Sequence, residues 1–370
     1  MTRQNIYLLA AIAALFSGCS SVSRNDLIQS PKNDTEKIIY FGSLAGNSHN
    51  TQPWIVEIVN DSTLRLFADF SRKLQIVDPD GRGLFISLGA FLENMQLSAN
   101  SLGYNSNITI TAETNSDSLA AIFKFSRLTQ IGAFGNLTKL DNASLIEKRR
   151  TLRTPFLKTE ISKEHQSTLL ESISNYKGKV FYFSAASEKG KYIAEKTHEA
   201  YSCQSRDEQA KQELSNWMRF SNKDASKHKD GLTPLGMGIT GIGGFIVRNF
   251  YKPEDSMKES FVEKGIESAK EQVDNCGGWL VIVQDDDNPE NWMSTGRIYQ
   301  KLNLLSTDLM IGFHPMNQMI EEDKFETPAN EFLGLPGKIQ FVARIGYVES
   351  YPEAVSVRRP VNEIIRNSVK

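Results

Sequence analysis

Cysteine and histidine are scarce in this chain of 370 residues, which contains three cysteines and five histidines. No two cysteines form a C-x-x-C motif, and the histidines, at positions 49, 165, 198, 228 and 314, do not fall at metal-ligand spacing. The sequence therefore predicts no metal site. Cys203 and Cys276 could pair in an oxidising compartment, but two independent buried thiols are the better interpretation.

An excess of charge of one sign is also lacking, since Lys and Arg together number 42 and Asp and Glu 44. No global field predicts binding to nucleic acid or to an acidic surface, so an anionic ligand must be held by a local cluster of cations. The dinucleotide-binding pattern G-x-G-x-x-G is missing too, because the glycines from Gly231 to Gly244 do not open a helix after a strand. The length suggests two domains or one large double unit.

The first residues resemble an export signal. The apolar run from Ile6 to Phe16 is too short to span a bilayer as a helix. It is followed by Leu15-Phe16-Ser17-Gly18-Cys19, which resembles a lipoprotein signal with Cys19 as the lipidated residue. Residues 1–19 are then a signal peptide and residues 20–32 a tether to the membrane. The alternative is simple secretion with an incidental Cys19.

Lipidation would place the protein in the cell envelope, on the periplasmic side. Ser20 would direct it to the outer membrane if the cell is Gram-negative. Thr2-Arg3-Gln4 resembles the start of a twin-arginine signal, but Gln4 replaces the second arginine. The choice between the Sec and twin-arginine routes therefore stays open.

Apolar periodicity and turn residues predict a mixture of helices and strands. Asn33-Asp34-Thr35 offers helix caps, Gly103 ends a buried helix, and Asp230–Phe245 is Gly-rich and apolar, as in a long loop or lid. The expected helices are 83–102, 163–175, 188–201, 207–220, 256–275 and 291–311, and the expected strands are 53–59, 63–68, 107–112, 119–125, 180–183, 279–283 and 339–347. The two halves also echo each other weakly: residues 97–104 resemble residues 305–313 with one residue of slip.

The most informative stretch is Asn47-Ser48-His49-Asn50-Thr51-Gln52-Pro53-Trp54, which leads into an apolar run. Short amide and hydroxyl side chains at the mouth of a strand can hydrogen-bond the edges of a planar ligand, while Trp54 anchors the loop to the core. The same residue types also dominate ordinary turns and helix caps, which is the competing interpretation.

A second dense motif is Arg149-Arg150-Thr151-Leu152-Arg153. Its three guanidiniums and one hydroxyl form a compact donor set, and arginine can hold a phosphate through two parallel hydrogen bonds. On spacing alone, a solvated basic helix end is the better explanation of this run.

These two motifs resemble those of a known family. S-x-N-x-Q-P-W, from Ser48 to Trp54, resembles the flavin-contacting motif of the FMN-dependent nitroreductase family, and H-N-T-Q-P-W resembles its Acg-like branch. The arginine run resembles the family's R-R-S-x-R phosphate motif, with Thr151 in place of serine. Gly46-Asn47 stand where the family usually has Pro-Ser.

The resemblance implies FMN as the cofactor. Gly312–Gln318 lies where the family places a loop whose backbone N–H groups face the flavin N5, and Arg358-Arg359-Pro360 resembles its closing R-x-P segment. No catalytic side chain is implied, because N5 carries the chemistry. The implied cofactor-binding residues are Ser48, Asn50, Gln52, Arg149, Arg150, Thr151, Arg153, Pro315, Met316, Asn317, Gln318, Arg358 and Arg359.

The implied fold class is α+β: two nitroreductase-like halves fused into a pseudo-dimer, with mixed β-sheets flanked by helices. The halves are residues 33–144 and 145–370, and a lid-like insertion lies around 222–255. The first half carries the N-x-Q-P-W loop and the second half carries the arginine motif. One flavin site can therefore be assembled within a single chain, without an oligomer.

The implied function is ping-pong hydride transfer from NAD(P)H through FMN to a nitroaromatic, a quinone or a similar acceptor. One alternative is a flavin-binding or flavin-storage protein without significant turnover, with residues 231–245 as the lid. Another is a lipoprotein whose fold has lost FMN and survives as an interaction module.

Overall fold

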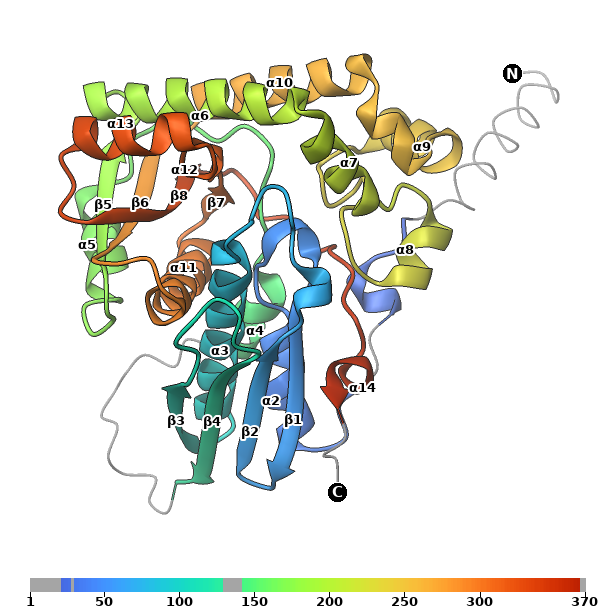
Figure 1. The fold of residues 1–370 in the computed structure, drawn as a ribbon, viewed down its shortest axis with the longest axis vertical. Helices are drawn as coiled ribbons and strands as arrows, with labels where there is room; N and C mark the ends of the chain where they lie inside the picture. The colour runs from blue at the N-terminus through green and yellow to red at the C-terminus, as the bar shows by residue number, and fades with distance from the viewer. Residues whose placement is uncertain (1–20, 28–29, 129–141, 367–370) are drawn as a thin grey trace, which may run out of the picture.

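Two β-sheets flank a central pair of helices in the computed structural model, which describes residues 21–27, 30–128 and 142–366 (Figure 1). Residues 1–20, including Cys19 and the expected signal peptide, lie outside the described residues. The first sheet has the strand order β3-β4-β2-β1-β9 and the second β5-β6-β8-β7. The strands are β1 (Trp54–Asn60), β2 (Thr63–Ala68), β3 (Tyr104–Ile110), β4 (Leu119–Arg127), β5 (Lys179–Ser184), β6 (Gly278–Gln284), β7 (Ile311–Pro315), β8 (Lys338–Tyr347) and β9 (Ile365–Arg366).

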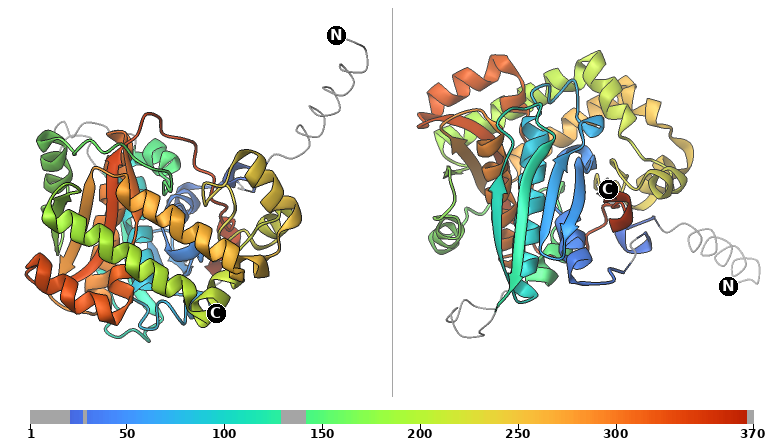
Figure 2. Two further views of the ribbon diagram at one scale, coloured as in Figure 1. Left: turned by 90° about the horizontal axis from the view of Figure 1, so that it is seen from above. Right: turned by 60° about the horizontal axis from the view of Figure 1, so that its bottom comes forward.

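Helices separate the sheets and cover one end of the molecule (Figure 2). α2 begins at the cap that the sequence predicts: Asn33 Oδ1 accepts a hydrogen bond from the backbone N–H of Glu36 at 2.8 Å. The α-helices are α2 (Asp34–Ser43), α3 (Arg82–Ser101), α4 (Asn142–Lys148), α5 (Lys163–Glu171), α6 (Glu188–Arg206), α7 (Glu208–Asn216), α8 (Asn222–His228), α9 (Gly241–Phe250), α10 (Glu259–Asp274), α11 (Pro289–Asp308), α12 (Gln318–Glu321), α13 (Asp323–Leu333) and α14 (Val361–Ile364). The short 3-10 helices are η1 (Arg24–Asp26), η2 (Ser48–Asn50), η3 (Phe70–Arg72) and η4 (Pro253–Met257).

The two halves approach each other closely where α3 and α11 cross, and glycine permits this approach on both helices. A Cβ on Gly89 would lie 2.0 Å from the carbonyl oxygen of Met293, and a Cβ on Gly296 would lie 1.9 Å from that of Ile86. The offset of 207 residues between Gly89 and Gly296 also separates Ile86 from Met293. Equivalent residues of the two helices therefore make the same contact in both directions, so the crossing is two-fold symmetric.

The same offset extends to the ends of both helices. Leu102 caps α3 and Leu309 caps α11 with nearly equal backbone angles (φ −84° and −82°). The next residues are Gly103 and Met310, and both have positive φ, at 81° and 56°. Met310, rather than Gly312, thus takes the place of Gly103, so the alignment of the sequence echo moves by two residues at this point.

The strand orders correspond in the same way, because β3-β4-β2-β1 matches β7-β8-β6-β5. β1 and β2 are joined by a tight turn, whereas α6 to α10 lie between β5 and β6. One plan thus recurs on both sides of the α3–α11 crossing, with an insertion in the second half. β9 adds to β1 in parallel, with Val56 opposite Ile365. The first sheet is therefore mixed, as expected, but the second is antiparallel throughout its described strands.

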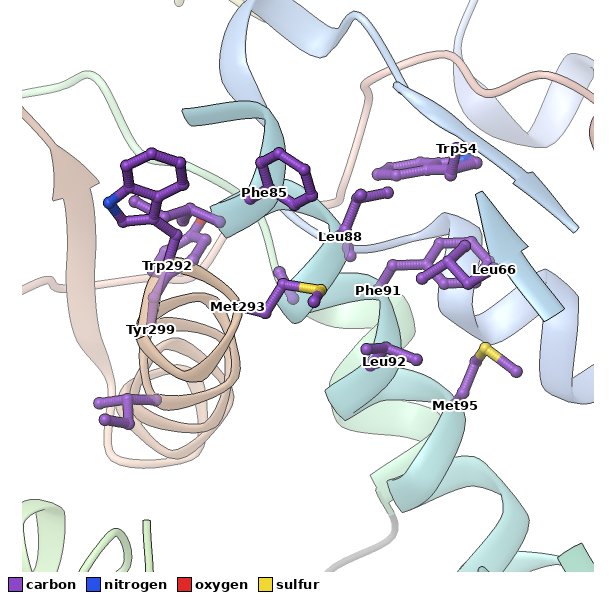
Figure 3. Packing of buried hydrophobic residues seen from close by; sticks show 14 of the residues in the cluster. Trp54, Leu66, Phe85, Leu88, Phe91, Leu92, Met95, Trp292, Met293 and Tyr299 are labelled. Atoms are coloured by element: carbon purple, nitrogen blue, oxygen red, sulfur yellow. The ribbon is translucent and has the colours of Figure 1, made fainter. Parts of the chain in front are cut away.

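The core is shared by both halves. Trp54 at the start of β1 is fully buried, and its ring centroid lies 5.0 Å from that of Phe91 on α3. Where the helices cross, the ring centroids of Phe85 on α3 and Trp292 on α11 are 6.0 Å apart (Figure 3). One hydrophobic cluster includes these residues from both halves, so the α3–α11 seam is part of the protein interior.

Three expectations are corrected by the structure. Asp230–Phe245 is not all loop, because α9 begins at Gly241. Cys276 is buried but Cys203 is exposed, so only one thiol is packed in the core. The described part of the 20–32 tether is docked on the protein: the side chain of Arg24 is buried, and the backbone N–H of Val22 donates to Asn222 Oδ1 at 3.1 Å. Among the described residues, no helix is long and apolar enough to cross a bilayer.

Substituting Gly296 with alanine should destabilise the protein by about 3 kcal/mol, because the new Cβ would meet the backbone carbonyl of Ile86, which cannot move aside as a side chain can. The measurement is urea-induced unfolding. Gly243→Ala in α9 is the matched control: its Cβ would meet only a methyl group of Ile239 at 3.9 Å. That control should be neutral or stabilising by up to about 1 kcal/mol. Equal stability of the two variants would contradict the close α3–α11 crossing.

Candidate functional site

The loop before β1 is held in an unusual backbone conformation. His49, Asn50 and Gln52 all have positive φ, at 48°, 55° and 54°. This region is sparsely populated by residues other than glycine, and it recurs at ligand-binding sites where surrounding contacts enforce it. Here Asn47 provides such a contact, because its Oδ1 accepts from the backbone N–H of Gln52 at 2.8 Å. Asn47 thereby closes the loop.

The adjoining Gly46 is required by helix α11. A Cβ at this position would lie 2.0 Å from the hydroxyl oxygen of Tyr299. The backbone N–H of Gly46 also donates to Gln300 Oε1 at 3.2 Å in the buried interior. Gly46-Asn47 therefore replaces the Pro-Ser of the family pattern for two local reasons: space for Tyr299 and closure of the loop by Asn47.

Two arginines near the C-terminus bind the polar side chains of this loop. Arg358 Nη1 donates to Asn50 Oδ1 at 2.6 Å, and the backbone N–H of Arg359 donates to Gln52 Oε1 at 2.8 Å. Arg359 Nη2 also donates to the carbonyl of Trp54 at 2.9 Å. The structure thus brings the expected site residues of the two halves into direct contact.

The amide groups of the same loop side chains are bonded to the insertion. Asn50 Nδ2 donates to the carbonyl of Gly231 at 3.1 Å, and Gln52 Nε2 to that of Lys229 at 2.8 Å. Both side chains are therefore bonded to protein groups through the amide oxygen and the amide nitrogen, and they position the loop between the C-terminal arginines and the insertion. Ser48, at the start of η2, contacts α3 through its backbone N–H, which donates to Ser87 Oγ at 3.4 Å.

Of the arginines in the motif, Arg149 has the environment that points most directly to a bound ligand. It directly follows α4, its side chain is buried, and its Nη2 donates to the carbonyl of Leu44 at 3.0 Å. Its Nε and Nη1 are also inaccessible to solvent and have no hydrogen-bond partner among the described residues. Because buried donors are nearly always paired, two free donors on one guanidinium indicate a place for an acceptor.

Arg149 lies in a cluster of cations at the C-terminal end of α2. Arg358 Nε donates to the carbonyl of Ser43 at 2.8 Å, and Arg24 lies close to both arginines. Burial, and then the charges of Arg149 and Arg24, lower the pKa of Arg358 to about 9. Within the described residues, neither Arg149 nor Arg358 forms an ion pair. The end of α2 offsets part of this positive charge through its carbonyl groups, and an anion would offset the rest.

The other residues of the motif line the same region. Arg150 Nη1 donates to the carbonyl of Glu353 at 2.6 Å, while its Nε is buried and has no partner among the described residues. Thr151 is partly buried. Arg153 Nη1 donates to the carbonyl of Gly236 at 2.9 Å, so the insertion contacts this half of the motif as well.

The end of β7 completes the site from the second sheet. Pro315 is the last residue of β7, so the expected loop of residues 312–318 is a strand over its first half. Met316 is buried, and Asn317 Oδ1 accepts from the backbone N–H of Val342 at 2.8 Å. Gln318 begins α12, and its Oε1 is buried without a partner among the described residues.

Two histidines that lie within the quoted motifs, but not among the expected cofactor-binding residues, lie near Arg153. Burial and then the charge of Arg153 lower the pKa of His49 to about 4, and burial, Arg344 and Arg153 lower the pKa of His314 well below its usual value. Arg344 Nε donates to His314 Nδ1 at 3.0 Å. Fully buried Arg344 is also a structural hub, because its guanidinium donates to the carbonyls of Leu152 and Thr154. The sequence offered no local signal for this role, since Arg344 lies in an apolar strand.

Comparison with known proteins identifies the family. The model of the Nitroreductase family matches residues 146–347, which is more than half of the chain. The chain belongs to the Nitroreductase family. The matched segment begins within α4, just before Arg149, and ends with the last residue of β8.

Relatives of this nitroreductase-family chain are distant. An uncharacterized protein of Mycobacterium tuberculosis (strain ATCC 25618 / H37Rv) is 30% identical over 115 residues, which are 30% of this chain and 32% of that protein. The match thus spans about a third of the length of this curated relative. A putative nitroreductase from Anabaena variabilis aligns over 89% of this chain and 92% of its own, with 12% identity and a TM-score of 0.44. The FMN-dependent nitroreductase NfnB from Mycobacterium smegmatis, in complex with NADPH, aligns over 57% and 93%, with 14% identity and a TM-score of 0.37.

Replacing His49 with glutamine should make stability less sensitive to acid. The pKa of His49 is lowered in the folded state, so its contribution is complete above pH ~6.5 and is lost as the pH falls toward 4, where the unfolded chain takes up a proton that the folded chain does not. The measurement is the free energy of unfolding in urea at pH 7.5 and at pH 4.5.

The wild type should lose more stability between these pH values than His49→Gln does. The comparison isolates His49, because His314 and the buried carboxyl groups of Asp78 and Glu321 remain in both proteins. Exposed His228→Gln is the control and should follow the wild type. Parallel curves for the wild type and His49→Gln would show that burial of His49 does not exclude its charged form.

Proposed function

We propose that the protein is an FMN-binding oxidoreductase of the nitroreductase type, which passes hydride from NAD(P)H to a nitroaromatic, a quinone or a similar acceptor. The observation that carries this proposal is Arg149, a buried guanidinium beside buried Arg358, with two donors that have no hydrogen-bond partner among the described residues. Membership of the Nitroreductase family supports the reaction class.

The donor set fits the phosphate of FMN. A phosphate oxygen accepts strong hydrogen bonds from guanidinium groups, and a dianion would relieve the repulsion among Arg24, Arg149 and Arg358. The Nε atoms of Arg150 and Arg359 are also buried without a hydrogen-bond partner in the part of the chain that the structure describes. We assign Arg149 and Arg358 as the principal phosphate-binding residues, with Arg150, Thr151, Arg153 and Arg359 beside them.

Bound FMN would supply hydride acceptance and return at its N5, and the chain would supply binding, orientation and exclusion of water. In this assignment Asn50 and Gln52 hold the η2 loop in its strained conformation through Arg358 and Arg359. We assign Gln318, whose Oε1 is buried without a partner among the described residues, to a polar edge of the ring. Both sets of site residues come from one chain, so the proposed site needs no second subunit.

A second candidate function, flavin storage without significant turnover, is favoured by one specific observation. Asn50, Gln52 and Arg153 all donate to backbone carbonyls of the insertion, at Gly231, Lys229 and Gly236. These contacts hold the insertion against the site and would restrict the approach of a nicotinamide ring. We therefore propose that the insertion around residues 222–255 is a lid that limits access to the site.

We further propose that the protein acts in the cell envelope, on the periplasmic side, attached by a lipid at Cys19. The motif that ends at Cys19 supports this location.

Substituting Arg149 with glutamine should weaken FMN binding about ten- to a hundredfold, because a charge-assisted contact worth about 1.5–3 kcal/mol is lost. The measurement is titration of the apoprotein with FMN, followed by flavin fluorescence. Arg127→Gln is the control, since Arg127 lies on β4 with a side chain that is 73% exposed. An unchanged affinity of Arg149→Gln for FMN would contradict the proposed phosphate site.

Anaerobic mixing of the FMN-loaded protein with NADH or NADPH separates the two candidate functions. An oxidoreductase should lose the visible flavin absorption rapidly with at least one donor, because the nicotinamide reaches the ring. A storage protein should keep its colour with both donors. Dithionite is the control, since it reduces flavin without requiring a nicotinamide site.

A further inference from the structure

Residues 21–27, the N-terminal segment, are fixed to the second half of the protein. The segment lies beside α8 (Figure 1), where the backbone N–H of Val22 donates to Asn222 Oδ1 at 3.1 Å. The backbone N–H and the Oγ of Ser23 both donate to Asp26 Oδ2, at 2.7 and 2.9 Å, and these bonds close the short helix η1. The segment therefore has a defined structure on the protein.

Arg24, the first residue of η1, brings a cation into the protein interior. The residue is 8% exposed, and its Nε is inaccessible to solvent and has no hydrogen-bond partner among the described residues. Asp26, the nearest carboxylate in the sequence, is bonded to Ser23 instead. The charge of Glu147 acts on Arg24, but Glu147 is exposed and does not form an ion pair with it. The positive charge of Arg24 is thus buried without an ion pair in the part of the chain that the structure describes.

Arg24 belongs to the same cluster of cations as the proposed phosphate-binding residues. Arg149 and Arg358 lie side by side, because Nη2 of each donates to the carbonyl of Leu44, at 3.0 and 3.5 Å. Burial lowers the pKa of Arg24, and the charge of Arg149 acts in the same direction. Burial and the charges of Arg149 and Arg24 likewise lower the pKa of Arg358. Arg24 and Arg149 both direct an unpartnered Nε into this buried region.

We propose that Arg24 is a third arginine that binds the phosphate of FMN, an assignment that rests on FMN being the cofactor of this protein. Guanidinium groups donate strong hydrogen bonds to phosphate, and the dianion would offset the charge that Arg24, Arg149 and Arg358 bring together. Arg24 lies outside residues 146–347, which the family model matches. The N-terminal segment of this chain thus adds a cation of its own to the site.

Docking of the N-terminal segment and binding of FMN are then linked. If docked Arg24 strengthens FMN binding, bound FMN must strengthen the docking of the segment by the same factor. Riboflavin has the same ring and no phosphate, so it should have neither effect. A dependence on the phosphate therefore distinguishes a ligand contact from a merely structural role of Arg24.

The first test is titration of the full-chain apoprotein with FMN and with riboflavin, followed by flavin fluorescence in phosphate-free buffer. Arg24→Gln should weaken FMN binding about tenfold, because one charge-assisted contact is lost, and should leave riboflavin binding unchanged. The matched control is Lys32→Gln, which removes an exposed cation nearby in the sequence and should leave both affinities unchanged. Unchanged FMN affinity of Arg24→Gln, or an equal loss for both flavins, would overturn the proposal.

The second test is hydrogen–deuterium exchange of the wild-type protein, which holds even if Arg24→Gln is unstable. The reporters are the backbone amides of Val22, Ser23, Asp26 and Leu27, which all donate hydrogen bonds in the docked segment. Saturating FMN should slow their exchange about tenfold, and riboflavin should not. Exchange that FMN leaves unchanged, or that both flavins slow equally, would overturn the proposal.

Arg149→Gln in the same titrations separates failure of this proposal from failure of the proposed function. A loss of FMN affinity in Arg149→Gln but not in Arg24→Gln would overturn only the role of Arg24. Unchanged FMN affinity in both variants would overturn the phosphate site and the role of Arg24 together.

Discussion

The crossing of α3 and α11 is the constraint on which the rest of the structure depends. Gly89 and Gly296 let the backbones touch, and this contact sets the separation of the two sheets. It also places Tyr299 and Gln300 of α11 under the loop that precedes β1, where Gln300 binds Gly46. The strained backbone from His49 to Gln52 is therefore supported by a helix of the other half, and the candidate site exists only when the halves are packed.

A second constraint is the cost of buried positive charge. Arg149 and Arg358 lie inside the protein without an ion pair among the described residues, and their partners are carbonyl groups at the end of α2 and one amide oxygen. Burial of a charge with neutral partners is expensive. Such an arrangement is expected where a bound anion offsets the positive charge. The same anion would allow the arginines of the motif to lie close together.

Local signals in the sequence account for much of the fold. Asn33 caps α2, the turn around Asp61 joins β1 to β2, and the long apolar periodicities become α3 and α11, because caps, turns and buried faces are decided by neighbouring residues. Elsewhere, tertiary contacts overrode the local signals of the sequence. The glycines of residues 231–245 obscure α9, which packs through Val247, and the polar residues around Arg24 are docked on the domain instead of forming a free tether.

The sequence by itself determined the family, the α+β class and the two motifs, because these reside in residue types at short spacing. Only the tertiary structure decided what the motif residues do. It turned Asn50 and Gln52 toward Arg358 and Arg359, left Arg149 with donors that no described residue accepts from, and put His49 and His314 near Arg153. The physical reason is that hydrogen-bond partners and burial are set by segments hundreds of residues apart, and no local pattern encodes which of them meet.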